Sequence, residues 1–103
     1  AKGIATSNAQ EIAAIPDVFA LHANYPNPFN PSTTIAFALP EAGEVELAIY
    51  NIAGQRIATL VSGYKNAGRY QMQWDARNVA SGVYFYRLQA AGQVQTRQMT
   101  LVK

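Results

Sequence analysis

Residues 34–50, TIAFALPEAGEVELAIY, decide the fold class of this chain of 103 residues. Large apolar residues take every second position from Ile35 to Leu39 and again from Val45 to Ile49, with small or polar residues between them. A period of two places alternate side chains on opposite faces, so both runs predict half-buried β-strands. The intervening PEAG has turn chemistry, which predicts a hairpin or a tight corner between the strands.

Turn residues also separate the predicted strands further along the chain. Gly54 separates the second strand from another that reaches Val61, and Gly63 and Gly68 are expected to bracket a loop. Apolar alternation then returns over residues 69–75, RYQMQWD, which predicts a further strand.

The last third of the chain has the strongest β propensity. Residues 83–88, VYFYRL, are rich in aromatic and β-branched side chains, and Ala91 and Gly92 predict a two-residue turn into residues 94–102. Short strands separated by turns every 8–12 residues or so are typical of sandwiches. The predicted fold class is therefore all-β: an immunoglobulin- or fibronectin-like antiparallel β-sandwich of about seven strands.

Residues 1–15 differ from the rest of the chain. They are mostly Ala, Ser, Thr, Asn and Gln, a composition that buries little, with one short helical turn expected near residues 10–14. We interpret residues 1–15 as a linker remnant from a preceding cargo domain and residues 16–103 as the folded domain.

Composition narrows the function classes. The net charge is +2 and the eight basic residues are scattered singly, whereas nucleic-acid binders gather them on one face, so no nucleic-acid partner is expected. The chain has no cysteine, no apolar run of membrane-spanning length and no signal-peptide pattern at its start. If the domain is exported, we expect the signal on a longer precursor.

The sequence offers little catalytic chemistry. A Ser/His/Asp triad would have to use His22, the one histidine, with Asp17 or Asp75. Glu44 and Glu46 share one face of a strand, but that face is the polar one, so a solvated edge is the favoured interpretation. Residues 74–78 are interpreted as a turn and not as a calcium loop. We expect no enzyme activity, no metal site and no cofactor.

Residues 25–31, YPNPFNP, hold three prolines within six positions. Proline removes a backbone donor and restricts the residue before it, so the segment is stiff. As a structural element it would enter the sandwich as a rigid strand, with Tyr25 and Phe29 capping one end and the prolines protecting a sheet edge.

The proline motif also carries a resemblance. Residues 24–35, NYPNPFNPSTTI, resemble the opening motif of type A C-terminal sorting domains of the type IX secretion system. The resemblance continues through residues 45–54, 67–75 and 81–88 to the closing residues 99–103. The immunoglobulin-like domain of flagellar hook-capping proteins is related in fold, but the proline motif favours sorting.

The resemblance implies a function and partners. It implies a non-catalytic tail that takes a cargo in the same precursor through the periplasm to the cell surface or the medium. An outer-membrane translocon would recognise the tail and a sortase-like surface protease would remove it. The residues that match the family's signal elements, and that we predict for recognition, are Pro26, Asn27, Pro28, Gly82, Tyr84, Leu88 and Lys103.

The last predicted strand has physical features that a partner protein can bind. An exposed strand edge pairs with another strand through its backbone, and Lys103 adds charge. The same free edge would allow an edge-to-edge homodimer.

Two non-sorting interpretations remain open. Eleven aromatic residues in a charge-poor domain suit a carbohydrate-binding accessory module of a secreted enzyme. Alternatively, the domain is a structural spacer between such an enzyme and the surface.

Overall fold

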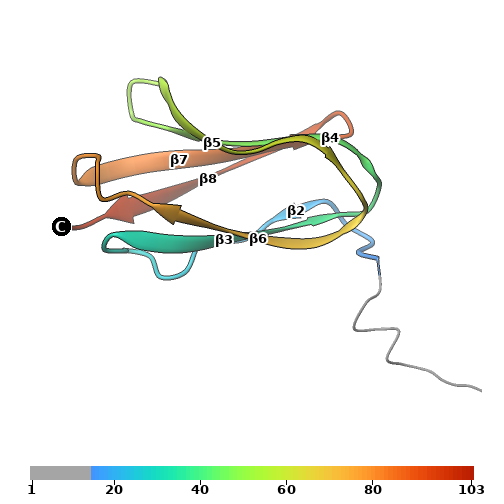
Figure 1. Cartoon of the computed structure of the whole chain (residues 1–103), viewed down its shortest axis with the longest axis horizontal. Coiled ribbons are helices and arrows are strands. Elements are labelled where there is room, and N and C mark those ends of the chain that lie inside the picture. The colour runs from blue at the N-terminus through green and yellow to red at the C-terminus, as the bar shows by residue number, and fades with distance from the viewer. Residues whose placement is uncertain (1–14) are drawn as a thin grey trace, which may run out of the picture.

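A computed structural model describes residues 15–103, and these fold into two facing antiparallel sheets (Figure 1). The strands are β2 (Ala20–Leu21), β3 (Ser32–Leu39), β4 (Gly43–Tyr50), β5 (Arg56–Lys65), β6 (Gly68–Asp75), β7 (Gly82–Ala90) and β8 (Gln93–Leu101). One sheet has the order β2-β3-β6 and the other β5-β4-β7-β8. The predicted seven-stranded β-sandwich is confirmed. Residues 1–14, which hold almost all of the predicted linker, lie outside the described residues.

The first predicted turn is a corner between the sheets and not a hairpin. β3 ends at Leu39 in the three-stranded sheet, and β4 starts at Gly43 in the four-stranded sheet. Leu39 and Val45 are both buried, so each strand needs its apolar face on the core. Placing the two strands in opposite sheets allows both faces to meet.

The predicted loop between Gly63 and Gly68 is wrong, because β5 runs through Gly63 as far as Lys65. Gly63 pairs with Val45 of β4 and has φ of +131°, a conformation that L residues rarely adopt. Glycine adopts it without a steric cost, so the residue that suggested a loop continues the ladder.

The predicted turn at Ala91 and Gly92 is confirmed. The two residues connect β7 to β8 with φ of 51° and 77°. Two positive φ values in succession match the right-handed twist of a two-stranded ribbon, as in type I′ hairpins. β7 and β8 then pair without a break from Ala90–Gln93 to Gly82–Leu101.

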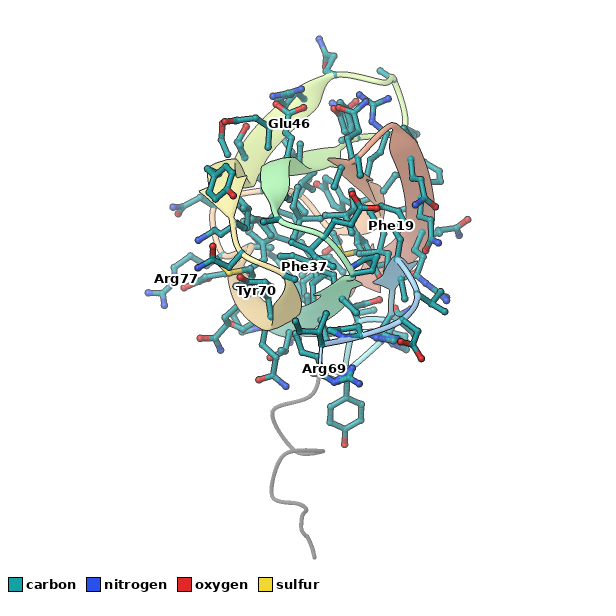
Figure 2. All side chains as sticks on the ribbon, turned by 90° about the vertical axis from the view of Figure 1, so that its right-hand side faces the viewer. Phe19, Phe37, Glu46, Arg69, Tyr70 and Arg77 are labelled. Carbon is teal, nitrogen blue, oxygen red and sulfur yellow. The ribbon has the colours of Figure 1, made fainter. Side chains whose placement is uncertain are left out.

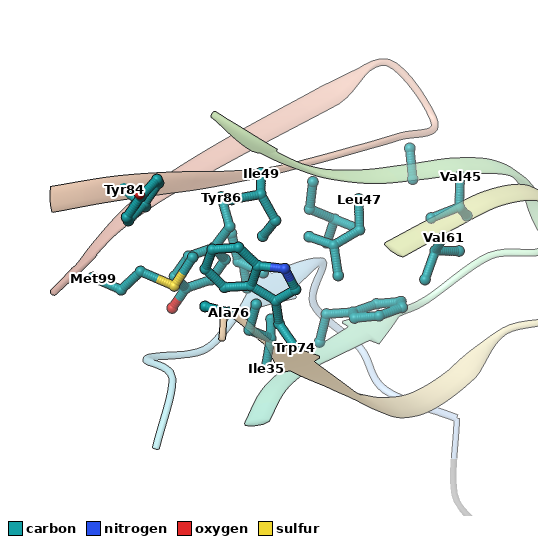
Figure 3. Packing of buried hydrophobic residues seen from close by; sticks show 14 of the residues in the cluster. Ile35, Val45, Leu47, Ile49, Val61, Trp74, Ala76, Tyr84, Tyr86 and Met99 are labelled. Atoms are coloured by element: carbon teal, nitrogen blue, oxygen red, sulfur yellow. The ribbon is translucent and has the colours of Figure 1, made fainter. Parts of the chain in front are cut away.

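The core fills the space between the sheets (Figure 3). The indole of Trp74 lies near Ala76 and Ile35 of the three-stranded sheet side and faces Tyr86 and Met99 of the other sheet. Trp74, Tyr84 and Tyr86 are all buried, as expected for aromatic residues in so small a sandwich. The largest apolar side chains therefore stabilise the fold from inside.

The two long flanks of the sandwich differ (Figure 2). β2 and β8 lie together on the flank near Phe19, whereas β5 and β6 lie on the flank near Tyr70. The described chain enters at Ile15 at one end, and Lys103 lies at the other end (Figure 1). Within residues 15–103, no helix is long and apolar enough to span a membrane.

Candidate functional site

The proline segment, residues 25–31, projects from one end of the sandwich between β2 and β3. Tyr25 forms two backbone hydrogen bonds with Thr34 of β3, of 3.0 and 2.9 Å, which fix the start of the segment. Pro26, Asn27 and Pro28 are exposed, while the Phe29 side chain is only 2% exposed and plugs the core. The peptide bonds before Pro26, Pro28 and Pro31 are cis. Phe29 caps the sandwich as predicted, but the prediction for Tyr25 is wrong, because its side chain is 81% exposed.

The proline segment pairs with the end of β8. The Phe29 N–H donates to the Thr100 carbonyl at 3.0 Å, and the Val102 N–H donates to the Phe29 carbonyl at 2.9 Å. The Asn27 Oδ1 accepts a third hydrogen bond from the Thr100 N–H at 3.0 Å. Two segments that are more than 70 positions apart in the sequence therefore form one short parallel ladder.

This ladder corrects an expectation about the last strand. The outer edge of β8 at Thr100 is not free for a partner, because Asn27 and Phe29 already satisfy its backbone N–H and carbonyl. The reason is the stiff proline segment, which brings a donor and two acceptors to that edge. A protein that recognises this end meets a strand that is already paired.

A small network of polar side chains fixes the start of the proline segment. The buried Asn24 Nδ2 donates to the Pro26 carbonyl at 3.2 Å and to Thr33 Oγ1 at 3.0 Å, and the Thr33 hydroxyl donates to the Pro26 carbonyl at 2.9 Å. Bonds from Asn and Thr side chains to a nearby backbone carbonyl stabilise turns of this kind. Asn24 Oδ1 is buried without a partner among the described residues.

The stretch before the segment is held to the four-stranded sheet. The Tyr86 hydroxyl donates to the His22 carbonyl at 2.7 Å, and Arg97 Nε donates to the Leu21 carbonyl at 2.5 Å. Gln95 bonds to Leu21 of β2 and to the residue before β2: its Oε1 accepts from the Leu21 N–H at 2.8 Å and its Nε2 donates to the Phe19 carbonyl at 3.2 Å. Burial of the phenol raises the pKa of Tyr86 above its ordinary value, so the hydroxyl stays protonated as a donor.

Aromatic packing connects the segment to the loop before β7. The ring of Phe29 lies 5.8 Å from that of Trp74, which contacts Tyr84 edge-on at 5.6 Å between centroids. The Tyr84 hydroxyl donates to the Ala80 carbonyl at 2.6 Å. In addition, the Ala76 N–H donates to the Pro31 carbonyl at 2.9 Å. The loop after β6 and the proline segment are therefore fixed relative to each other.

The structure brings most of the predicted recognition residues to one end of the sandwich. Gly82 pairs with Leu101 at the end of β8, and the Lys103 ammonium donates to the Arg77 carbonyl at 2.7 Å. Tyr84 lies two residues after Gly82 in β7, and its side chain is buried. Leu88 is in the second half of β7 and completely buried. The exposed predicted residues at this end, which together with the end of β8 we call the end surface, are Pro26, Asn27, Pro28 and Lys103.

Sequence reasoning missed the residues that anchor the proline segment and the stretch before it. Phe29 was expected only as a cap, and Tyr86, Gln95 and Arg97 were not singled out as site residues. Tyr86 had a readable signal, since it stands at the inward positions of β7 between Tyr84 and Leu88. A hydroxyl at a core position requires a partner, and a loop carbonyl is the usual one.

Two of the residues considered for chemistry, Glu46 and Asp75, form ion pairs on the surface. Glu46 forms a bidentate ion pair with Arg56 at 2.7 and 3.2 Å, and the hydrogen bond from Arg56 lowers the pKa of that carboxyl. Asp75 forms an ion pair with Arg77 at 2.6 Å, and the Arg77 hydrogen bonds lower its pKa as well. Among residues 15–103 no three acidic, histidine or cysteine side chains gather as metal ligands.

Comparison with known families gives a match over most of the chain. Residues 23–103 match the family model described as the secretion system C-terminal sorting domain. Comparison with curated proteins finds no match. The matched range starts just before the proline segment and includes every strand from β3 to β8.

Proposed function

Because this chain belongs to the family of secretion system C-terminal sorting domains, we propose that its end surface, composed of the proline segment and the end of β8, is the recognised signal. The domain itself directs a cargo into type IX secretion. The cargo passes through the periplasm and the outer membrane to the cell surface or the medium. This family is not catalytic, and we infer that the chain has no enzyme activity of its own.

The observation that carries the proposal is the ladder between Phe29, Thr100 and Val102. In an unfolded chain these residues are separate short motifs, whereas in the folded domain they are one surface. A receptor that binds this surface binds only cargo whose tail has folded.

The predicted recognition residues divide into two roles. Pro26, Asn27, Pro28 and Lys103 are exposed, so they are available for direct contact. Gly82 supports the end of β8 through its pairing with Leu101. Tyr84 and Leu88 are buried, and we propose that they act by holding β7 in place beneath the surface.

We propose two partners for the exported domain, an outer-membrane translocon and a sortase-like surface protease. A sorting domain is part of a cargo precursor that interacts with the secretion machinery. The described chain enters at Ile15, at the end opposite the proline segment (Figure 1). The cargo junction and the end surface are therefore both accessible at once. We retain residues 1–15 as a linker and residues 16–103 as the domain.

The test compares two asparagines in the same exposed segment. Residues 1–103 are fused behind a signal peptide and a fluorescent reporter in a bacterium with a type IX system. Asn27→Ala removes the acceptor for the Thr100 N–H, while Asn30 is exposed and is the matched control. We expect Asn27→Ala to lose most surface fluorescence while keeping its thermal midpoint within a few degrees, and Asn30→Ala to retain it. Equal surface delivery by both variants would contradict the proposal.

A further inference from the structure

The outer edge of β6 has a regular row of backbone groups that face away from the molecule. In β3, Thr34 and Ala36 direct their backbone groups toward Tyr25 and His22. The β3 residues between them therefore direct their backbone groups toward β6, where their partners are Tyr70, Met72 and Trp74. It follows that Arg69, Gln71, Gln73 and Asp75 direct their N–H and carbonyl groups outward.

The side chains on this edge are self-complementary. The exposed positions of β6 are Arg69, Gln71, Gln73 and Asp75. When two copies of β6 lie antiparallel and centred on Met72, Arg69 of one copy is opposite Asp75 of the other, and Gln71 is opposite Gln73. These four residues direct their backbone groups outward, so in this register they also form the backbone hydrogen bonds between the two copies. Opposite charges across such a pair are favourable, and like charges are unfavourable.

Sheet edges are usually protected, whereas no segment within residues 15–103 covers the outer edge of β6. β5 carries register shifts opposite Leu47/Ala48 and Ile49/Tyr50, and such bulges discourage further pairing. β8 is covered at Thr100 by the proline segment. β6 pairs with β3 over eight consecutive residues without a shift and contains no proline. Tyr70 and Met72 are only half-buried on its inner face, so a further strand would cover apolar surface.

We propose that two copies of this chain associate through β6, in antiparallel register with Met72 on the two-fold axis. The sheet β2-β3-β6 continues into its copy and becomes six-stranded. Asp75 then shares its carboxylate between Arg77 of its own chain and Arg69 of the copy. The end surface lies at the end of the sandwich and includes none of β6, so this pairing neither depends on the sorting proposal nor blocks it.

The test exchanges charge at the two central exposed positions of the full 103-residue chain. One variant carries Gln71→Lys and Gln73→Lys, and the other Gln71→Glu and Gln73→Glu. In the proposed register each homodimer opposes like charges, whereas the mixture opposes Lys to Glu. Neither glutamine forms a side-chain hydrogen bond or ion pair with another residue in the described range 15–103, so both variants should keep the fold.

Molar mass is measured by light scattering over a dilution series, with circular dichroism as the check on folding. The wild type is expected to approach twice the chain mass at high concentration, each variant to remain at one chain mass, and their equal mixture to recover the doubled mass. A matched control, Thr96→Lys with Gln98→Lys on exposed positions of β8, is expected to behave as wild type. A wild type that stays monomeric throughout, or a control that loses the doubled mass instead, would overturn the proposal.

A second measurement fixes the register. The chain has no cysteine, so Met72→Cys introduces a single thiol at the proposed axis. Directly opposite residues in a non-hydrogen-bonded pair are about 4.5 Å apart at Cα, within reach of a disulfide. Mild oxidation is expected to give a covalent dimer from Met72→Cys and little from Thr96→Cys. Equal cross-linking of both variants would contradict this register.

Discussion

The two flanks of this sandwich are built differently. On the flank of β2 and β8, side chains of Gln95 and Arg97 bond to the backbone of β2, and further along β8 the proline segment pairs with Thr100. On the flank of β5 and β6, the outer edges of both strands have no backbone partner within the described residues, and Met72 of β6 is half-buried. We call the flank of β2 and β8 the closed flank and that of β5 and β6 the open flank. The closed flank joins the first and last parts of the domain, so the end surface exists only after folding.

The largest expected effect comes from removing the anchor of the proline segment. Phe29→Ala deletes a ring that is 2% exposed and packed on Trp74. We expect it to lower the free energy of unfolding by about 3–5 kcal/mol, as for other buried Phe→Ala changes. Denaturant unfolding measures the loss, and Tyr25→Ala, at an exposed position of the same segment, is expected to cost under about 0.5 kcal/mol. A Tyr25→Ala loss equal to that of Phe29→Ala would mean that the segment is not anchored by Phe29.

Opening the closed flank at Gln95 is expected to cost less. Gln95→Ala removes the acceptor for the Leu21 N–H and a donor to the Phe19 carbonyl. Because Leu21 is buried, its unpaired donor should cost about 1–3 kcal/mol. Denaturant unfolding at a concentration where the domain is monomeric measures the loss, and Gln71→Ala on the open flank is the matched control, with a change of under about 0.5 kcal/mol expected. Equal losses for the two glutamines would remove the distinction between the flanks.

A hydroxyl deletion on each flank sharpens the comparison further. Tyr86→Phe leaves the His22 carbonyl without its donor, whereas Tyr70→Phe removes an exposed bond to the Asn66 carbonyl. We expect a loss of about 0.5–1.5 kcal/mol for Tyr86→Phe and less for Tyr70→Phe, measured by denaturant unfolding. If Tyr70→Phe costs more, the closed flank is not the more tightly bonded one.

Tyr86 also gives a prediction for alkaline pH. Its pKa is raised in the folded domain because the phenol is buried, so the unfolded chain ionises first, near the ordinary value of about 10. Stability from this group is therefore fully present below that pH and decreases as the pH rises through it. Thermal midpoints from pH 8 to 11 are expected to fall less steeply for Tyr86→Phe than for the wild type. Parallel pH profiles would contradict this explanation.

The smallest effect is expected at the ion pair between Glu46 and Arg56. Arg56 lowers the pKa of Glu46, so this stabilisation is present at neutral pH and is lost only as the pH falls below the ordinary glutamate value and through the lowered one. Both groups are solvent-exposed, and water and salt screen such pairs. Glu46→Gln is therefore expected to leave the thermal midpoint at pH 7 within experimental error. A clear decrease would show that the outer face of the four-stranded sheet contributes more than we infer.

The sequence predicted what local periodicity determines. Alternation around Ile35 and Leu47, and the turn at Ala91 and Gly92, were sufficient for the strands and the β-sandwich. Gly63 was misinterpreted because glycine marks loops and also residues of positive φ within a strand, and a single sequence does not separate the two.

The end surface could be predicted only as separate motifs. Family resemblance singled out Asn27 and Lys103, but not that the backbone of Phe29 pairs with Thr100. That contact depends on how two distant segments meet, and no local pattern encodes it. The expectation of a free β8 edge fails at Thr100 for the same reason. Leu88 matched a family motif and is buried, because β7 supplies the core at that position.

The most direct test of the account is amide hydrogen exchange on the monomeric domain at low concentration. We expect the Thr100 and Val102 N–H groups to exchange slowly, since Asn27 and Phe29 accept their hydrogen bonds. The outward N–H groups of Gln71 and Gln73 on the open flank should exchange fast. In Asn27→Ala, only the Thr100 amide of these four should lose protection. Fast exchange at Thr100 and Val102 in the folded wild type would show that the proline segment and β8 do not form one surface.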